Sequence, residues 1–236
     1  MKILSLECSA KSASCAVIEE SKILCSDFTS SGLTHSQTLL PMVSDMINKA
    51  EVPFSDIDAF AVSAGPGSFT GIRIGISAVK GMALPKNAHC ISVSTLEAIA
   101  YNFLSEDALV CAVMDARCNQ VYNALFRIKD GKVKRLCEDR AVSIDFLKAE
   151  ILKSRVRCKI IVAGDGADLF FPFVKSKKNA IIADQKYRLQ NGEGVAKAAE
   201  VLYKKGIFTS AEQLLPIYLR LPQAERELKL KKETKK

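Results

Sequence analysis

The chain has 236 residues, of which 48% are hydrophobic, and a formal net charge of +8. This length and composition suffice for one large or two small globular domains. No apolar run approaches the roughly 20 residues of a membrane-spanning helix, and the apolar stretch before Glu7 is too short for a signal peptide. We therefore expect a folded, cytoplasmic protein.

The eight cysteines stand singly along the chain, several of them inside apolar runs, and no CxxC pair occurs. Disulfide frameworks and zinc sites need closely paired or regularly spaced cysteines. The spacing therefore predicts reduced thiols that are mostly buried as small apolar side chains.

The excess positive charge is concentrated at the C-terminus, where residues 226–236 contain six lysines and arginines and two glutamates. Such a run is typical of a solvated tail. The alternative is a weak electrostatic contact with RNA or an acidic partner. Because no aromatic side chains or RNA-binding motif accompany these charges, the tail is not expected to provide specificity.

The first part of the chain predicts a β-meander followed by alternating helices and strands. We expect strands at 2–6, 13–18, 21–28, 58–64 and 91–94, and helices at 35–50, 71–83 and 95–105.

The same pattern begins again in residues 109–133, again with an acidic residue at the end of its first strand, so that Glu7 aligns with Asp115. Later, Gly164 and Gly166 follow a buried strand as Gly65 and Gly67 do. Two imperfect copies of one unit are therefore predicted, joined near 100–108.

The predicted fold class is α/β, with two duplicated halves that each have a mixed sheet, a β-meander and flanking helices. This arrangement resembles the actin, hexokinase and Hsp70 architecture (ASKHA, ribonuclease H-like), in which two related halves face each other across a cleft. We expect an N-terminal half at 1–104, a C-terminal half at 105–215, and a C-terminal segment with the basic tail at 216–236. In that architecture the turn after the first strand of each half faces nucleotide phosphate, so Glu7, Ser9 and Asp115 are weak candidates for a nucleotide cleft.

The segment SAGPGSFTGIRIG at 63–75 has two interpretations. A glycine-rich turn before a helix can present backbone amides to an anion. However, its glycines do not form GxGxxG, and no GK[ST] follows as in a P-loop. The alternative is a structural turn, in which the glycines permit tight geometry and Ser68 or Thr70 caps the helix.

The two helices nearest this turn each carry a second stripe beside the one that faces the core. On the helix at 71–83 the second stripe is nearly bare of side chains, and on the helix at 35–50 it is apolar. One stripe suffices to dock a surface helix, so a second stripe predicts burial on two sides. The covering element is either the rest of this chain or a second subunit.

No independent catalytic centre is predicted. His35 and His89 lie in unrelated contexts, so a helical histidine pair for a metal is excluded. Ser68 is not part of a GxSxG motif and has no evident base. Glu7 with Asp115 has the residue types of a magnesium site, but acids at strand ends more often bond to backbone amides.

The motifs HSQTLLPMV, GPGSFTGIRIG, VSTLEAIA, DARCNQVYNALF and LPIYLR resemble the TsaB (YeaZ) family of bacterial tRNA threonylcarbamoyladenosine biosynthesis proteins. The matches to this family are spread in the same order from residue 3 to about 224. The resemblance implies a non-catalytic member of the actin-like architecture. His35 stands at the first histidine of the HxxxH metal motif of the catalytic paralogue TsaD, and Leu39 replaces the second. It also implies that the chain has no cofactor or metal of its own, with ATP bound only in the assembled complex.

The resemblance further implies that the two N-terminal helices bind TsaD, or form a homodimer in its absence. With the ATPase TsaE, the assembly transfers a threonylcarbamoyl group to the adenosine beside the anticodon of ANN-decoding tRNAs, so the chain meets tRNA indirectly. The expected interface residues are Leu39, Met42, Met46, Gly71, Gly75, Ala78 and Met82.

The sequence departs from the family where aspartate, threonine and serine usually end the first strand, because it has Glu7, Cys8 and Ser9 there. The longer acid weakens the case for a nucleotide site. Two rival functions remain at this stage: a glycoprotease-like peptidase that acts on the partner, and an ATP-dependent kinase-like enzyme of the same architecture.

Overall fold

The computed structural model describes residues 1–30, 32 and 34–220. The strands are β1 (Lys2–Glu7), β2 (Ala13–Glu19), β3 (Lys22–Thr29), β4 (Ile57–Gly65), β5 (His89–Ser94), β6 (Ala108–Asp115), β7 (Gln120–Lys129), β8 (Lys132–Arg135), β9 (Arg140–Ser143), β10 (Lys159–Ala163) and β11 (Ala180–Ile182). The α-helices are α1 (His35–Lys49), α2 (Phe69–Ala83), α3 (Thr95–Ala100), α4 (Ile144–Lys153), α5 (Ala167–Phe170), α6 (Gln185–Arg188) and α7 (Gly192–Lys204).

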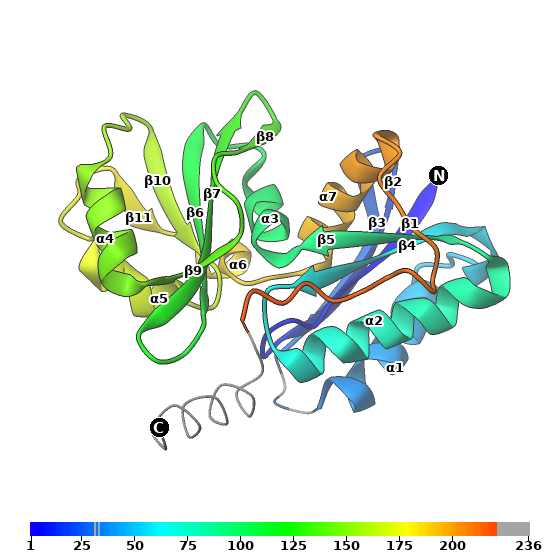
Figure 1. The fold of residues 1–236 in the computed structure, drawn as a ribbon. Helices are drawn as coiled ribbons and strands as arrows, with labels where there is room; N and C mark the ends of the chain where they lie inside the picture. The colour runs from blue at the N-terminus through cyan, green and yellow to red at the C-terminus, as the bar shows by residue number, and fades with distance from the viewer. Residues whose placement is uncertain (31, 33, 221–236) are drawn as a thin grey trace, which may run out of the picture.

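Two sheets with the same strand order form the framework (Figure 1). The first has the order β3-β2-β1-β4-β5, and the second has the order β8-β7-β6-β10-β11, with β9 paired to β7. In each sheet the central strand, β1 or β6, is antiparallel to the next strand of the meander and parallel to the strand on its other side. The duplication predicted from the sequence is confirmed.

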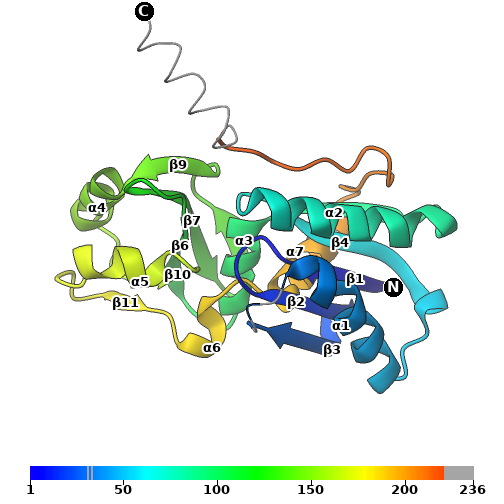
Figure 2. The ribbon, with the colours of Figure 1, turned by 90° about the horizontal axis from the view of Figure 1, so that it is seen from below.

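Helices cover both faces of each sheet (Figures 1 and 2). Side chains of α1 and α2 pack on one face of the first sheet, and α7 packs on the other. The second sheet lies between α3 and the pair α4 and α5. Burial on two faces explains why β1, β4, β6 and β10 read as continuous apolar runs rather than as alternating patterns.

Two helices cross between the halves. Although α3 precedes the second sheet in the chain, it packs on that sheet, while α7 follows the second sheet and packs on the first. These helices also contact each other at the centre of the molecule (Figure 1). This exchange of helices connects the two halves. The expected boundaries of the halves at residues 104 and 215 stay a prediction.

The predicted strands and helices of the first half are present, with two differences at helix ends. Helix α2 begins at Phe69, because the Ser68 hydroxyl accepts a hydrogen bond from the Gly71 amide over 3.3 Å and caps the helix. Helix α3 is shorter than predicted and continues as a 3-10 turn at Tyr101–Phe103. Tyr101 packs with the first sheet and Phe103 with the second.

An extended strap, residues 207–220, runs back over the first half (Figure 1). Thr209 forms an isolated bridge with Cys90, and the Ile217 amide donates to the Ala64 carbonyl over 2.7 Å. The predicted basic tail, residues 226–236, lies outside the described residues. Within the described part of the chain, no helix is both long and apolar enough to cross a membrane.

All eight cysteines are free, as the sequence predicted. Cys8, Cys15, Cys90 and Cys111 are buried, and Cys118 alone among the eight is fully exposed. Burial raises the pKa of the Cys15 thiol to about 12, so this thiol stays protonated at neutral pH.

Candidate functional site

The residues predicted for a nucleotide cleft lie where β1 of the first half and β6 of the second half end. At the end of β1, the Glu7 carboxylate accepts hydrogen bonds from both the amide and the hydroxyl of Ser9, each over 2.6 Å. Both side chains are buried. The acid therefore closes the turn that follows its own strand, which is the structural role that the sequence offered as an alternative to metal binding.

The second oxygen of the Glu7 carboxylate has no hydrogen-bond partner, and neither does the hydroxyl of Ser63 on β4. Burial raises the pKa of Glu7 above its ordinary value, although the nearby hydroxyls of Ser63 and Ser9 oppose this change. A nearby negative charge at Asp165 adds to the increase. The environment of Glu7 therefore favours the neutral carboxylic acid over the anion that would hold a cation.

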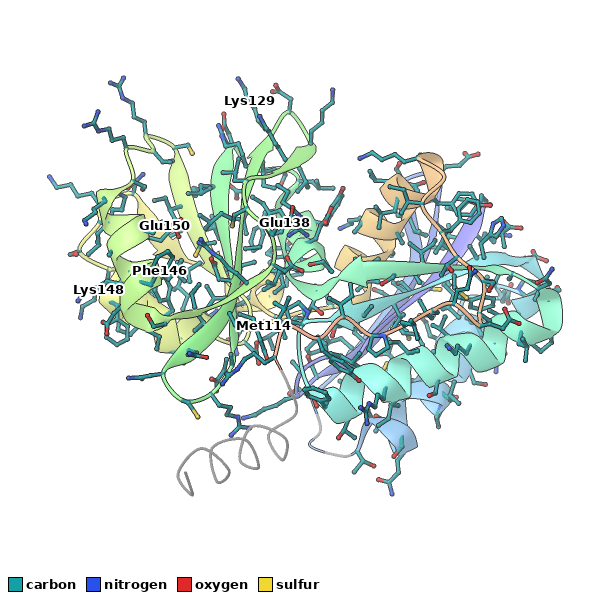
Figure 3. All side chains as sticks on the ribbon, in the orientation of Figure 1. Met114, Lys129, Glu138, Phe146, Lys148 and Glu150 are labelled. Atoms are coloured by element: carbon teal, nitrogen blue, oxygen red, sulfur yellow. The ribbon has the colours of Figure 1, made fainter. Side chains whose placement is uncertain are left out.

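Asp115 occupies the equivalent place in the second half and also bonds to the backbone, accepting from the Arg117 amide over 2.7 Å. Met114, the buried residue before it, lies where the two halves meet (Figure 3). Unlike Glu7, Asp115 is exposed. The structure thus places both predicted acids at the ends of equivalent strands.

Asp165 lies close enough to Glu7 and Asp115 to interact with their charges, and it was not among the predicted site residues. Gln190 donates to its carboxylate over 2.9 Å. Desolvation raises the pKa of Asp165, and the charge of Asp115 adds to the effect. Asp165 keeps exposed surface, whereas Glu7 has none. The GDG sequence at 164–166 was the available signal.

The glycine-rich turn packs directly on the turn after β1. The Ser68 amide donates to the Ser9 carbonyl over 2.6 Å, and a Cβ on Gly67 would lie only 2.8 Å from the Cβ of Ser9. The amides of Ser9 and Ser68 and the hydroxyl of Ser9 are thus donated within the chain, whereas a phosphate cradle needs such donors free. The geometry favours the structural interpretation of this turn.

The residues of the rival peptidase do not come together as a nucleophile and base. The His35 ring bonds to the Ala10 carbonyl over 2.7 Å, while the Ser68 hydroxyl caps α2. His89 stacks on Phe208 with ring centroids 3.8 Å apart, at the far side of the first half from this turn. Among the described residues, no group of three or more histidines, cysteines or acids is arranged to hold a metal ion.

The structure shows where the predicted interface residues of α1 and α2 lie. Leu39, Met42 and Met46 are buried in the core beneath α1, where the Cys15 thiol lies 3.4 Å from the Met46 sulfur. Their side chains pack against the first sheet of their own chain, Leu39 also lines the groove between α1 and α2, and all three stay predictions as interface residues.

Gly71 and Gly75 are also buried, because they let α2 approach the end of β1 closely. A Cβ on Gly71 would lie 3.2 Å from the carbonyl carbon of Cys8 and closer still to its oxygen. On Gly75 it would lie 2.7 Å from the Cys8 sulfur. The bare stripe is therefore covered from within, and its glycines serve packing inside the chain. Ala78 and Met82 are half-buried and stay predictions as interface residues.

The outer face of the helix pair includes residues beyond the predicted ones. A groove of about 570 Å³ runs between α1 and α2. Its exposed or half-buried lining combines apolar and small side chains, and it includes Leu40, Phe69, Ile74, Ser77 and Ala78. Leu40 is 50% exposed. Further along α2, Gly81 has no heavy atom within 4 Å of the position of a Cβ. This surface is open, shallow and largely uncharged.

Comparison with protein-family models assigns the chain to a family. The model described as "TsaD: tRNA N6-adenosine threonylcarbamoyltransferase" matches residues 29–226. The chain belongs to this family.

Relatives within this family point to one branch of it. The chain is 27% identical to the tRNA threonylcarbamoyladenosine biosynthesis protein TsaB of Bacillus subtilis, over 95% of this chain and 96% of that protein. It is 29% identical to TsaB of Escherichia coli, over 93% and 95% of the two chains. The resemblance to TsaB (YeaZ) is confirmed.

Solved structures give the same result for the fold. YeaZ from Pseudomonas aeruginosa superposes with a TM-score of 0.75 at 27% identity, covering 92% of this chain and 99% of that chain. Component A of (R)-2-hydroxyglutaryl-CoA dehydratase from Acidaminococcus fermentans has a TM-score of 0.50 at 11% identity, with 87% and 98% covered, which shows a shared fold alone. The α/β fold with two actin-like halves is confirmed.

Proposed function

We propose that this chain is a non-catalytic subunit of the assembly that forms threonylcarbamoyladenosine on tRNA, and that it acts by binding and stabilising the catalytic TsaD subunit in the cytoplasm. The names of its TsaB relatives supply the pathway. The observation that carries the subunit role is the open groove between α1 and α2, because this face has no cover within the described chain.

The cleft supports the non-catalytic part of the proposal. Its hydrogen-bond donors at Ser9 and Ser68 are already used within the chain, and Glu7 is buried beside a second acid. A phosphate brought to this turn would meet donors that are already satisfied instead of free amides. We propose that the isolated chain needs no nucleotide or metal, and that any ATP binds only in the assembled complex with TsaD and TsaE.

The groove supports a helical partner. Small residues on a helix face let another helix approach closely, and Ser77, Ala78 and Gly81 lie on the outer face of α2 between exposed apolar side chains at Leu40 and Leu84. A bundle of α1 and α2 with two helices of TsaD would bury this surface. In the absence of TsaD, a second copy of the chain would cover the same face and form a homodimer.

The first experiment is co-purification with TsaD, using variants that place bulk and charge on the outer face. Ser77→Arg and Ala78→Arg are expected to fold and to lose TsaD binding by more than tenfold, because an unpaired cation in an apolar contact is costly. Ser105→Arg adds the same side chain at an exposed position away from the groove and is the matched control. Unchanged binding by Ser77→Arg and Ala78→Arg would contradict the proposed face.

The second experiment is reconstitution of the modification with TsaD, TsaE and unmodified tRNA. Product formation is expected only when this chain is added, and Glu7→Gln is expected to support it at the wild-type rate because Glu7 is not catalytic. Transfer catalysed by this chain without TsaD, or its complete loss in Glu7→Gln that still binds TsaD, would contradict the non-catalytic role.

A further inference from the structure

Lysines and arginines gather at one edge of the second sheet, far from the cleft and from α1 and α2. The strand register sets this edge: Ala108 at the start of β6 pairs with Ile128 near the end of β7 and with Lys159 at the start of β10. The loops that enter β10 and β11 and the hairpin from β7 to β8 therefore emerge side by side. Lys129 at that hairpin points away from the molecule (Figure 3).

Eight exposed basic residues make up this surface, which we call the basic edge. They are Lys129, Lys132, Lys134, Lys153, Arg155, Arg157, Lys175 and Lys178. None of the eight forms an ion pair with another residue in the described ranges. The segments 151–159 and 171–180 contain no acidic residue. The two acids that precede β6 are already paired, Glu106 with Lys159 and Asp107 with Arg127.

The two loops that carry most of these charges are held together by hydrogen bonds. Lys177 donates to the carbonyls of Leu152 and Ser154, the latter over 2.8 Å. Asn179 donates to the carbonyls of Val156 and Cys158, over 3.0 and 2.6 Å. The exposed cations are thus presented from a fixed backbone, so that a ligand would not have to order the loops on binding.

The dimensions and position of the basic edge suit an extended polyanion. Five strands spaced by about 4.8 Å give the sheet a width of about 19 Å, which can span several successive phosphates. β7 has 10 residues, so the edge lies about 30 Å from the cleft turn at the other end of that strand. A partner on α1 and α2 would leave it free.

We propose that the basic edge binds the phosphate backbone of a folded RNA. The choice of RNA over other polyanions rests on the proposed function, whereas the unpaired charges do not depend on it. Backbone contacts of this kind add affinity without sequence readout. In the assembly, the chain would thereby hold the tRNA substrate directly, in addition to its contact with the catalytic subunit.

The test compares binding of a fluorescent unmodified tRNA transcript by the full chain and by two matched triple variants, over a series of salt concentrations. Arg155→Gln/Arg157→Gln/Lys178→Gln removes three charges from the basic edge. Lys22→Gln/Lys49→Gln/Lys205→Gln removes three exposed charges elsewhere. The plot of log K against log salt concentration has a negative slope. The magnitude of this slope is expected to decrease by about 2 to 3 in the first variant and by less than about 1 in the second.

Three results would overturn the proposal: equal loss in the two triple variants, absence of tRNA binding by the wild-type chain in 50 mM salt, or tighter binding to phosphatidylserine vesicles than to tRNA at the same salt. The comparison of the two triple variants is repeated in a chain with Lys231, Lys232, Lys235 and Lys236 changed to glutamine. If the two triple variants then no longer differ in tRNA binding, the tail is responsible for binding and the proposal for the basic edge is overturned. Reconstituted modification is measured separately. If the edge binds tRNA but the chain does not support modification, the proposed function fails and the edge stands.

Discussion

The two glycine positions 71 and 81 of α2 provide a sharp test of how this helix is seated. In a helix interior, replacing glycine by alanine stabilises by about 1 kcal/mol when the added methyl group has space. Gly81 has that space. At Gly71 the methyl group would press on the Cys8 carbonyl and also lie 3.3 Å from the His35 ring. Overpacking against backbone costs about 1 to 3 kcal/mol.

We therefore expect Gly81→Ala to raise the free energy of unfolding by up to about 1 kcal/mol. Gly71→Ala is expected to lower it by about 1 to 2 kcal/mol, because the steric cost exceeds the helical gain. For a chain of this size the two variants are expected to melt about 4 to 12 °C apart.

The assay is thermal denaturation followed by circular dichroism, at one protein concentration and with the oligomeric state of each variant measured by light scattering. That control is needed because Gly81 lies on the proposed partner face, and a change in dimerisation would shift the melting temperature by mass action. If Gly71→Ala melts at or above the wild-type temperature, close packing of α2 on Cys8 does not explain this glycine.

Three further predictions concern the buried acid, the exposed thiol and the strap. Burial raises the pKa of Glu7 in the folded state. The contribution of Glu7 to stability is therefore expected to fall as the pH rises from 4.5 towards that raised pKa, by up to about 1.4 kcal/mol for each pH unit. Glu7→Gln, which keeps the acceptor for Ser9, is expected to melt at a higher temperature than the wild type at pH 8 and to show less pH dependence. Equal pH profiles would refute this. With a thiol reagent under native conditions, the fastest-reacting group is expected to be Cys118, and an unchanged fast phase in Cys118→Ser would contradict it. Tyr218→Ala removes a stack on Phe69 with centroids 4.2 Å apart and is expected to cost about 1 kcal/mol, with faster proteolysis of the strap; an unchanged digestion pattern would exclude this anchoring role.

Much of the fold was predictable because its signals are local or repeated. The meanders have strand lengths and turns that sequence patterns specify well, and the alignment of Glu7 with Asp115 revealed the duplication. The crossing of α3 and α7 was not predictable in this way. An amphipathic helix such as α7, with its run of buried alanines, does not indicate which sheet it covers.

For the predicted interface residues, too, the sequence did not indicate which part of the structure packs against them. Helical periodicity correctly separated the faces of α2 but could not tell what lies against each face. The stripe with Gly71 and Gly75 has the composition of a helix-docking surface, and it is filled by the end of β1. Likewise, Asp165 stood in a recognisable GDG turn, but its proximity to Glu7 depends on how the two halves meet, a long-range feature absent from the local sequence.

The buried glycines and the turn after β1 together support the proposed role of α2 in partner binding. Gly71 brings α2 onto Cys8, whose thiol donates to the Gly71 carbonyl over 3.1 Å, and Ser68 bonds to Ser9 in the same turn. The turn that would face phosphate in an actin-like enzyme thus anchors the start of α2. A helix fixed in this way presents its outer face without further ordering, and the entropy cost of docking is lower. In this chain, then, the same contacts occupy the hydrogen-bond donors of the turn and fix the start of the helix for which we propose a partner.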